Sequence, residues 1–195
     1  MMIDKSFSWP REPVAIVAIG DSGEALLLRA VLESLGAVVL LHLPGTPDDV
    51  LKCLDQGADA PEYIILSGHG DETGFVLGEF VEEIDTSALV KGSLPPANLM
   101  SRINLPGKVV LSTACLTGNE AFAQAFLSGG VRAYIAPAEY PDGAAIPLFV
   151  HGFFYHLLQK QASLEEALNL ASAFDEAELA IALFKGTNVE ASTGS

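Results

Sequence analysis

A histidine and a cysteine occupy positions in this sequence that suit nucleophilic catalysis. His69 lies just beyond the apolar run Tyr63–Leu66, and Cys115 lies just beyond a second run, Val109–Ser112. A cysteine attacks a carbonyl group as its thiolate, and a neighbouring imidazole can take up the thiol proton or protonate the leaving amine. The pair therefore predicts acyl-transfer chemistry, provided that the fold brings the two residues together.

Backbone N–H groups beside these two residues could stabilise the charge that develops during the reaction. Attack on a carbonyl creates an oxyanion, which needs hydrogen-bond donors that point at one place. Gly70 directly follows the histidine, so its N–H and the N–H of Cys115 are the candidate oxyanion hole. The structural alternative is that Cys115 is a small buried residue and His69 a turn residue.

Short apolar runs alternate with amphipathic helical patterns along most of the chain, and these elements would position the two residues. Val14–Ile19, Val38–Leu41 and Arg132–Ala136 predict further buried strands. Between the first two, leucines at helical spacing predict a helix over Glu24–Leu35. The alternation predicts an α/β fold, a three-layer α-β-α sandwich with a mainly parallel sheet.

Asp21 is a third candidate, because it follows the first predicted strand directly. In open α/β sheets, ligands bind outside the carboxyl ends of the strands, where Asp21, His69 and Cys115 are all expected. A carboxylate at this edge would attract a cationic group. The alternative is that Asp21 only caps the helix that follows it.

Later segments complete the predicted domain. Phe75–Leu77 and Phe80–Ile84 predict a small hairpin around Gly78 and Glu79. Two helices are expected at the end, over Ile146–Lys160 and Leu164–Phe184. We expect a single domain over residues 1–185 and a flexible C-terminal tail over residues 186–195.

The composition narrows the classes of partner. The 195 residues include 10 Lys and Arg against 25 Asp and Glu, which gives a net charge of −15. Such a surface repels nucleic acid and anionic membranes. The sequence shows no signal peptide and no apolar run of about 18 residues that could span a membrane. The two cysteines, Cys53 and Cys115, form no disulfide framework, so we expect a cytoplasmic protein. No metal-binding motif and no cofactor-binding motif is present, so neither a metal nor a cofactor is expected.

Two blocks of this sequence resemble the caspase-like cysteine peptidases. Residues 64–70, with the sequence IILSGHG, resemble the apolar strand and His-Gly pair of these enzymes. Residues 109–118, VVLSTACLTG, resemble the block that carries their nucleophile, and the gap between the two residues is close to the roughly 50 of the caspase signature. The resemblance covers about residues 14–171 and is strongest to the bacterial CHAT group, which has similar later blocks at Ser128–Ala133, Phe149–Tyr155 and Ser163–Ala167.

The resemblance implies a role for each matching residue. His69 would be the general acid, Cys115 the nucleophile that attacks a peptide carbonyl, and Gly70 and Cys115 the oxyanion hole. In related enzymes the end of the first strand lines the pocket for the residue before the cleaved bond. Asp21 would lie there and favour Arg or Lys, and Glu139 is a second candidate for the same wall. The partner would be a peptide or protein substrate, and a protein partner or a homodimer could complete the shallow cleft that short loops would leave.

Two other functions fit the same sequence. A caspase-like module could have lost its activity and serve as a scaffold or peptide-binding domain. A flavodoxin-like domain could instead bind a ligand beside Asp21 and Ser22, with Cys115 buried and unrelated to His69. Gly20-Asp21-Ser22 also resembles the opening block of SGNH-type esterases, but the chain contains no Asp-x-x-His segment to complete that triad.

Overall fold

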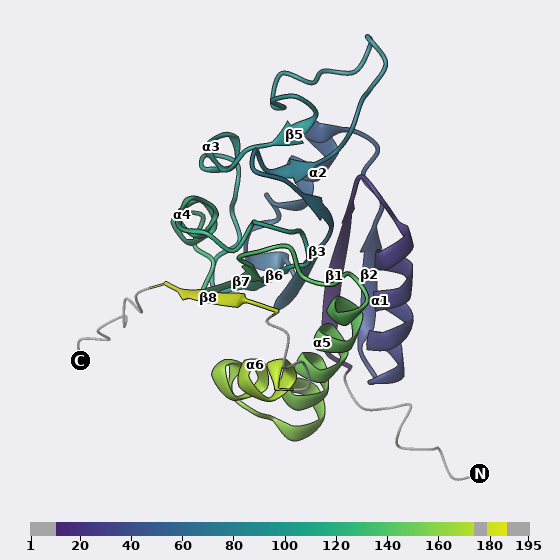
Figure 1. Ribbon diagram of the computed structural model, residues 1–195, viewed down its shortest axis with the longest axis vertical. Coiled ribbons are helices and arrows are strands. Elements are labelled where there is room, and N and C mark those ends of the chain that lie inside the picture. The colour runs from purple at the N-terminus through teal and green to yellow at the C-terminus, as the bar shows by residue number, and fades with distance from the viewer. Residues whose placement is uncertain (1–10, 174–178, 187–195) are drawn as a thin grey trace.

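The computed structural model describes residues 11–173 and 179–186, which form one mixed sheet between two layers of helices (Figure 1). The strand order is β2-β1-β3-β6-β7-β8, and the first five of these strands are parallel. The strands are β1 (Pro13–Ile19), β2 (Val38–His42), β3 (Tyr63–Gly70), β6 (Val109–Ser112), β7 (Ala133–Pro137) and β8 (Ile181–Lys185). A mainly parallel sheet covered by helices confirms the predicted fold class.

Alternating side chains of the strands supply two apolar cores, one on each face of the sheet. Along β1, Ala15, Val17 and Ile19 belong to one core, while Val14 and Ile16 belong to the other. The first core is covered by α2 (Pro47–Cys53), α3 (Pro96–Leu99) and α4 (Glu120–Ser128), and the second by α1 (Gly23–Ser34), α5 (Ala145–Phe154) and α6 (Leu164–Ser172). These strands are apolar at nearly every position because both of their faces are buried.

The end of the chain differs from the predicted helix over Leu164–Phe184. The helix α6 ends at Ser172, and Ile181–Lys185 forms β8, which pairs antiparallel with β7. A short apolar run cannot be assigned to a helix or a strand from its periodicity alone. The segment Ile181–Lys185 forms a strand because it pairs with the edge of β7, which also places Phe184 beside the buried Tyr134, with ring centroids 6.5 Å apart. The predicted helix over Ile146–Lys160 is present as α5, continued by a π-helical turn over Tyr155–Gln159.

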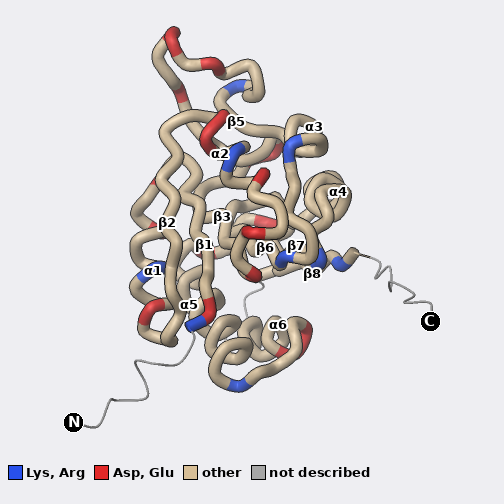
Figure 2. Tube along the Cα trace, turned by 180° about the vertical axis from the view of Figure 1, so that it is seen from behind, with Lys and Arg blue, Asp and Glu red and all other residues tan. Residues whose placement is uncertain are grey.

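The predicted hairpin around Gly78 and Glu79 is also wrong. The short strand β4 (Phe75–Val76) pairs with β3 and with β5 (Ser93–Leu94), so the chain runs on to residue 92 before it returns. Leu77 and Gly78 both donate their N–H groups to the carbonyl of Gly92, which closes this longer loop. The loop over residues 77–92 projects from the rest of the molecule and carries acidic residues near its tip (Figure 2).

The predicted domain boundary and tail are only partly within the described chain. Residues 187–195, most of the predicted flexible tail, lie outside the described residues. Within residues 11–173 and 179–186, no helix is both long and apolar enough to cross a membrane.

Candidate active site

The end of β3 carries His69 between two glycines, and both glycines are required by close backbone contacts. A Cβ on Gly68 would lie 2.3 Å from the carbonyl oxygen of Ile19 in β1. A Cβ on Gly70 would lie 2.1 Å from the carbonyl oxygen of Cys115. The backbone after the histidine therefore packs directly against the backbone of the cysteine. The His69 side chain itself is 73% exposed at this edge of the sheet.

A tight turn after β6 carries Cys115, and buried hydroxyl groups hold its shape. Thr117 donates its hydroxyl to the carbonyl of Ala114 (2.7 Å) and accepts from the Ser112 hydroxyl (2.9 Å). The Ser112 oxygen in turn accepts the N–H of Ala114 at 3.1 Å. Leu116 adopts a left-handed conformation with φ of 59°, which is uncommon for a residue with a side chain and shows how sharply the chain turns after the cysteine.

The surroundings of Cys115 raise the pKa of its thiol. The side chain is half-buried, and burial is the main cause that raises its pKa above the ordinary value of 9.0. The negative charge of Glu24 raises the pKa further, while the N–H of Cys115 itself opposes the shift. Burial also raises the pKa of Cys53, followed by the charge of Asp49. Both free cysteines therefore have a raised pKa, and neither thiol has the lowered pKa of an activated cysteine.

Asp21 faces the histidine and also supports the start of α1. Its Oδ2 lies 3.8 Å from Nε2 of His69, a distance that becomes an ion pair when the imidazole is protonated. Its Oδ1 accepts the N–H of Gly23 at 2.9 Å, the first residue of α1. One oxygen of Asp21 thus supports the start of α1, while the other lies toward His69.

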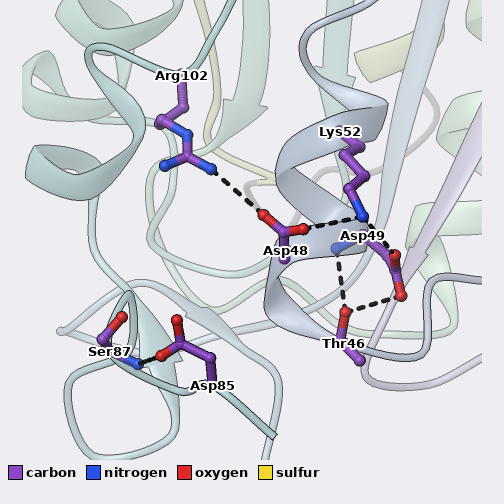
Figure 3. A network of polar contacts seen from close by, with 7 residues as sticks. All are labelled: Thr46, Asp48, Asp49, Lys52, Asp85, Ser87 and Arg102. Atoms are coloured by element: carbon purple, nitrogen blue, oxygen red, sulfur yellow. Dashed lines mark hydrogen bonds and ion pairs between the residues drawn. The ribbon is translucent and has the colours of Figure 1, made fainter.

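A cavity of about 200 Å³ opens beside Asp21, between the ends of β1 and β2 and the start of α2. Its lining includes Asp21, Leu43, Thr46, Leu77 and Phe80. The helix α2 is fixed at this wall, because the Thr46 hydroxyl accepts the N–H of Asp49 (3.2 Å) and donates to its carboxylate (2.7 Å; Figure 3). The hydrogen bond from Thr46 is also the main cause that holds the pKa of Asp49 below its usual range.

The first turn of α2 is also tied to the chain before β6. Asp48 pairs with Lys52 one turn later at 2.9 Å and with Arg102 at 3.4 Å (Figure 3). These pairs are exposed, so their contribution to stability is small. They connect the first turn of α2 with the segment that leads into β6.

Glu139 lies beside the cysteine turn but not at the cavity. Its carbonyl oxygen accepts the N–H of Leu116 at 3.2 Å, and its side chain is exposed. It is absent from the residues that line the cavity next to Asp21. Tyr140, the next residue, is 61% exposed, and its pKa is raised by partial desolvation and by the charges of Glu72 and Cys115.

Glu24 is the residue at this edge that the sequence patterns did not single out. Its Oε1 accepts the hydroxyls of Ser67 (2.7 Å) and Thr113 (2.5 Å), which come from the ends of β3 and β6. The available signal was the presence of hydroxyl residues at the ends of otherwise apolar strands. Among the described residues, no group of three side chains is arranged to hold a metal ion.

Sequence comparisons find no match for this chain, whereas comparisons with solved structures find similar folds. No protein-family model and no curated protein matches the sequence. Gingipain R, described as an Arg-specific cysteine proteinase, is 14% identical and superposes with a TM-score of 0.59 over 89% of this chain and 46% of its own. The complex of Porphyromonas gingivalis RgpB pro- and mature domains gives 14% identity and a TM-score of 0.58 over 90% of this chain and 47% of that chain.

A third solved structure comes from a different kingdom. Saccharomyces cerevisiae separase, solved in complex with securin, is 10% identical and superposes with a TM-score of 0.57 over 90% of this chain and 12% of its own. The chain spans about half the length of the gingipain chains it matches. At these identities the superpositions concern the fold. The sheet order, the two helical layers and these three superpositions show that the chain shares its fold with gingipain R and with separase.

Proposed function

We propose that this protein is a cysteine endopeptidase of the caspase-like type, with Cys115 as nucleophile and His69 as general acid. The observation that carries the proposal is the contact between the backbones of Gly70 and Cys115, at the ends of the neighbouring strands β3 and β6. A nucleophile and an acid–base group at one edge of a sheet, on a fold shared with peptidases, fit peptide-bond hydrolysis.

The reaction assigns a task to each group. The imidazole of His69 takes the thiol proton, and the Cys115 sulfur forms a bond to the carbonyl carbon of the substrate. The imidazolium then gives that proton to the amine as the C–N bond breaks, which leaves a thioester. Water, with its proton taken by His69, hydrolyses the thioester and returns the free thiol. Cys115 N–H has no acceptor outside its own residue among the described residues, so together with Gly70 it can serve the oxyanion.

The cavity beside Asp21 supports a preference for cleavage after Arg or Lys. A carboxylate on its wall can form a charge-assisted pair with a basic side chain, and the net charge of −15 attracts such a substrate. The 3.8 Å separation from His69 means that Asp21 could also orient the imidazolium. Glu139 stays a weaker candidate for contact with substrate, through its position beside Leu116.

The inactive scaffold or peptide-binding module is the alternative that one observation favours. Burial and the charge of Glu24 raise the pKa of Cys115, whereas a reactive cysteine commonly has a lowered pKa. In the scaffold the same fold would bind a protein partner without cleaving it. Assignment to the bacterial CHAT group, a cytoplasmic location and a protein partner or second copy at the cleft remain part of the proposal and rest on the sequence blocks described above.

An activity-probe experiment distinguishes the two functions. Arg, Lys and Asp acyloxymethyl-ketone probes would be applied under reducing conditions to the wild type, Cys115→Ala, Asp21→Asn and the matched control Cys53→Ala. We expect Arg and Lys probes to label the wild type and Cys53→Ala, to label Asp21→Asn more weakly, and to leave Cys115→Ala unlabelled. Absence of labelling by every probe, with the protein folded, would favour the scaffold.

A further inference from the structure

Glu24 accepts hydrogen bonds from two separate strand ends through a single oxygen atom. The Ser67 hydroxyl reaches its Oε1 from β3 at 2.7 Å, and the Thr113 hydroxyl reaches the same atom from the end of β6 at 2.5 Å. Thr113 also accepts the N–H of Gly68 at 3.3 Å, which closes the network between the two strands. Ser67 and Thr113 are both buried, so these bonds are sheltered from water.

These hydroxyls lie two residues before the proposed catalytic residues. Because side chains alternate along a strand, Ser67 and His69 lie on the same face of β3. Thr113 has the same spacing from Cys115 on the adjacent segment. The N–H of Thr113 donates to the carbonyl of Leu66 at 3.0 Å, so the two hydroxyl residues are neighbours across the strands. Glu24 therefore binds each of the two segments two residues before the proposed catalytic residue, His69 on one segment and Cys115 on the other.

Among the described residues, the carboxylate of Glu24 forms no ion pair that would account for its position at this edge. By contrast, Glu33 on the same helix pairs with Arg29 at 2.8 Å. A carboxylate at this edge costs free energy through desolvation and through repulsion of a thiolate nearby. The hydrogen bonds that the carboxylate accepts from Ser67 and Thr113 offset this cost.

We infer that Glu24 is a positioning residue, which fixes the ends of β3 and β6 relative to each other and so sets the alignment of His69 with Cys115. Its catalytic meaning rests on the function proposed above. Burial is the main cause that raises the pKa of the Cys115 thiol, and the same carboxylate adds a smaller contribution in the same direction. Glu24 from α1 acts on the pKa of the thiol, Cys115 acts on that of Tyr140 in the loop after β7, and His69 is carried by the adjacent strand β3.

Two substitutions separate alignment from charge. Glu24→Gln keeps an acceptor oxygen for both hydroxyls and removes the negative charge, while Glu24→Ala removes both. Glu33→Gln is the matched control, since it makes the same change on the same helix, away from the site. The measurements are the pH profile of Cys115 alkylation by iodoacetamide, hydrogen exchange of the Gly68 amide, and hydrolysis of a basic peptide substrate.

Each variant has a distinct expected result. Glu24→Gln should shift the alkylation profile to lower pH, because the thiol loses a negative neighbour, while Gly68 exchange stays slow and hydrolysis stays within about tenfold of the wild type. Glu24→Ala should exchange Gly68 faster and lose about 100-fold in hydrolysis, the scale that a misplacement of about 1 Å can cause. Glu33→Gln should match the wild type in all three measurements.

The proposal is overturned if Glu24→Ala retains wild-type exchange at Gly68, or if Glu24→Gln exchanges Gly68 as fast as Glu24→Ala does. Should Glu24→Ala fail to fold, Ser67→Ala and Thr113→Val each remove one hydroxyl and should each give a smaller loss of the same kind. Alkylation and exchange need no substrate, so they test the alignment even if the wild type hydrolyses no peptide. An inactive wild type with these shifts present would refute the peptidase and leave the role of Glu24 intact.

Discussion

The body of the sheet and the carboxyl ends of its strands are built from different kinds of residue. Strand positions in the body are almost all apolar and buried, and they pack into two cores. Toward the carboxyl ends the buried residues become hydroxyl-bearing, with Ser67 in the last half of β3 and Ser112, Thr113 and Thr117 at and after the end of β6. Burial of apolar surface is non-directional, whereas a buried hydroxyl is stable only if a partner lies in the right direction.

Because of this difference, the apolar cores mainly determine stability, whereas the hydroxyl network mainly determines the geometry of the strand ends. The cores can tolerate changes in side-chain shape at a modest cost, because apolar contacts re-form in many arrangements. The polar network at the carboxyl ends specifies one arrangement, because each hydroxyl has a named partner. We therefore expect substitutions in the body to lower stability without altering the chemistry of Cys115, and substitutions at the carboxyl ends to alter that chemistry more than they alter stability.

The largest loss of stability should come from the body. Phe153 is fully buried, stacks on Phe149 with centroids 5.9 Å apart and meets Phe154 edge to face. Phe153→Ala should lower the free energy of unfolding by about 3–5 kcal/mol, measured by urea denaturation. Leu148→Ala, at a position 59% exposed on the same helix, should change it by no more than about 0.5 kcal/mol. Altered alkylation of Cys115 in folded Phe153→Ala would contradict the separation of the two regions.

Gly70→Ala should affect both properties, with the larger effect on chemistry. The new Cβ would lie 2.1 Å from the carbonyl oxygen of Cys115, so the two backbones must move apart. We expect a loss of about 1–3 kcal/mol in the free energy of unfolding and of at least about 100-fold in hydrolysis. Gly143→Ala adds the same atom where nothing lies within 4 Å and should leave both measurements unchanged. Equal results for the two variants would show that Gly70 is not needed for close contact.

Tyr134 joins the body to the cysteine turn, so its hydroxyl tests the boundary between the two regions. Its ring stacks on Phe126 with centroids 4.4 Å apart, and its hydroxyl donates to the carbonyl of Thr117 at 3.1 Å. Burial raises the pKa of Tyr134 strongly, so the phenol remains a donor. Tyr134→Phe should cost about 1 kcal/mol in thermal or urea unfolding, because the buried carbonyl loses its partner. Tyr155→Phe, at an exposed ring, should cost nothing measurable.

The smallest effect should be a pH-dependent one at Asp71, just after Gly70. Partial burial acts to raise its pKa, but hydrogen bonds from Ser93, Gly74 and Thr73 outweigh it and lower the pKa below the ordinary value of 3.8. Its contribution is therefore present above that pH and is lost as the pH falls through the lower value of the folded state.

The variant Asp71→Asn should be less stable than the wild type at pH 7 by less than about 1 kcal/mol, because solvent screens the largely accessible carboxylate. Below the folded-state value the two proteins should converge, as measured by urea denaturation across the acid range. Asp85 lies in the loop over residues 77–92, where its carboxylate accepts the N–H of Ser87 in a similar local turn. The variant Asp85→Asn serves as a control away from the site and should not change Cys115 alkylation. If the stability difference were the same at every pH, the charge of Asp71 would not be its cause.

Much of the fold follows from the sequence because local patterns and long-range packing agree there. The runs at β1, β3 and β6 are apolar on both faces, which only a covered, mainly parallel sheet can bury. The same runs placed His69 and Cys115 at strand ends without any knowledge of strand order. The two errors, the hairpin at Gly78 and the helix to Phe184, fall where a short segment has no strong period and its partner decides its structure.

The sequence by itself determined the residue types and the strands that end at them: an imidazole, a thiol and a carboxylate, each just past an apolar run. Only the tertiary structure decided which of these backbones touch, that β8 closes one edge of the sheet, and that Glu24 binds Ser67 and Thr113. The physical reason is that burial depends on local pattern, whereas a hydrogen bond between residues 43 or 89 positions apart depends on strand order and register.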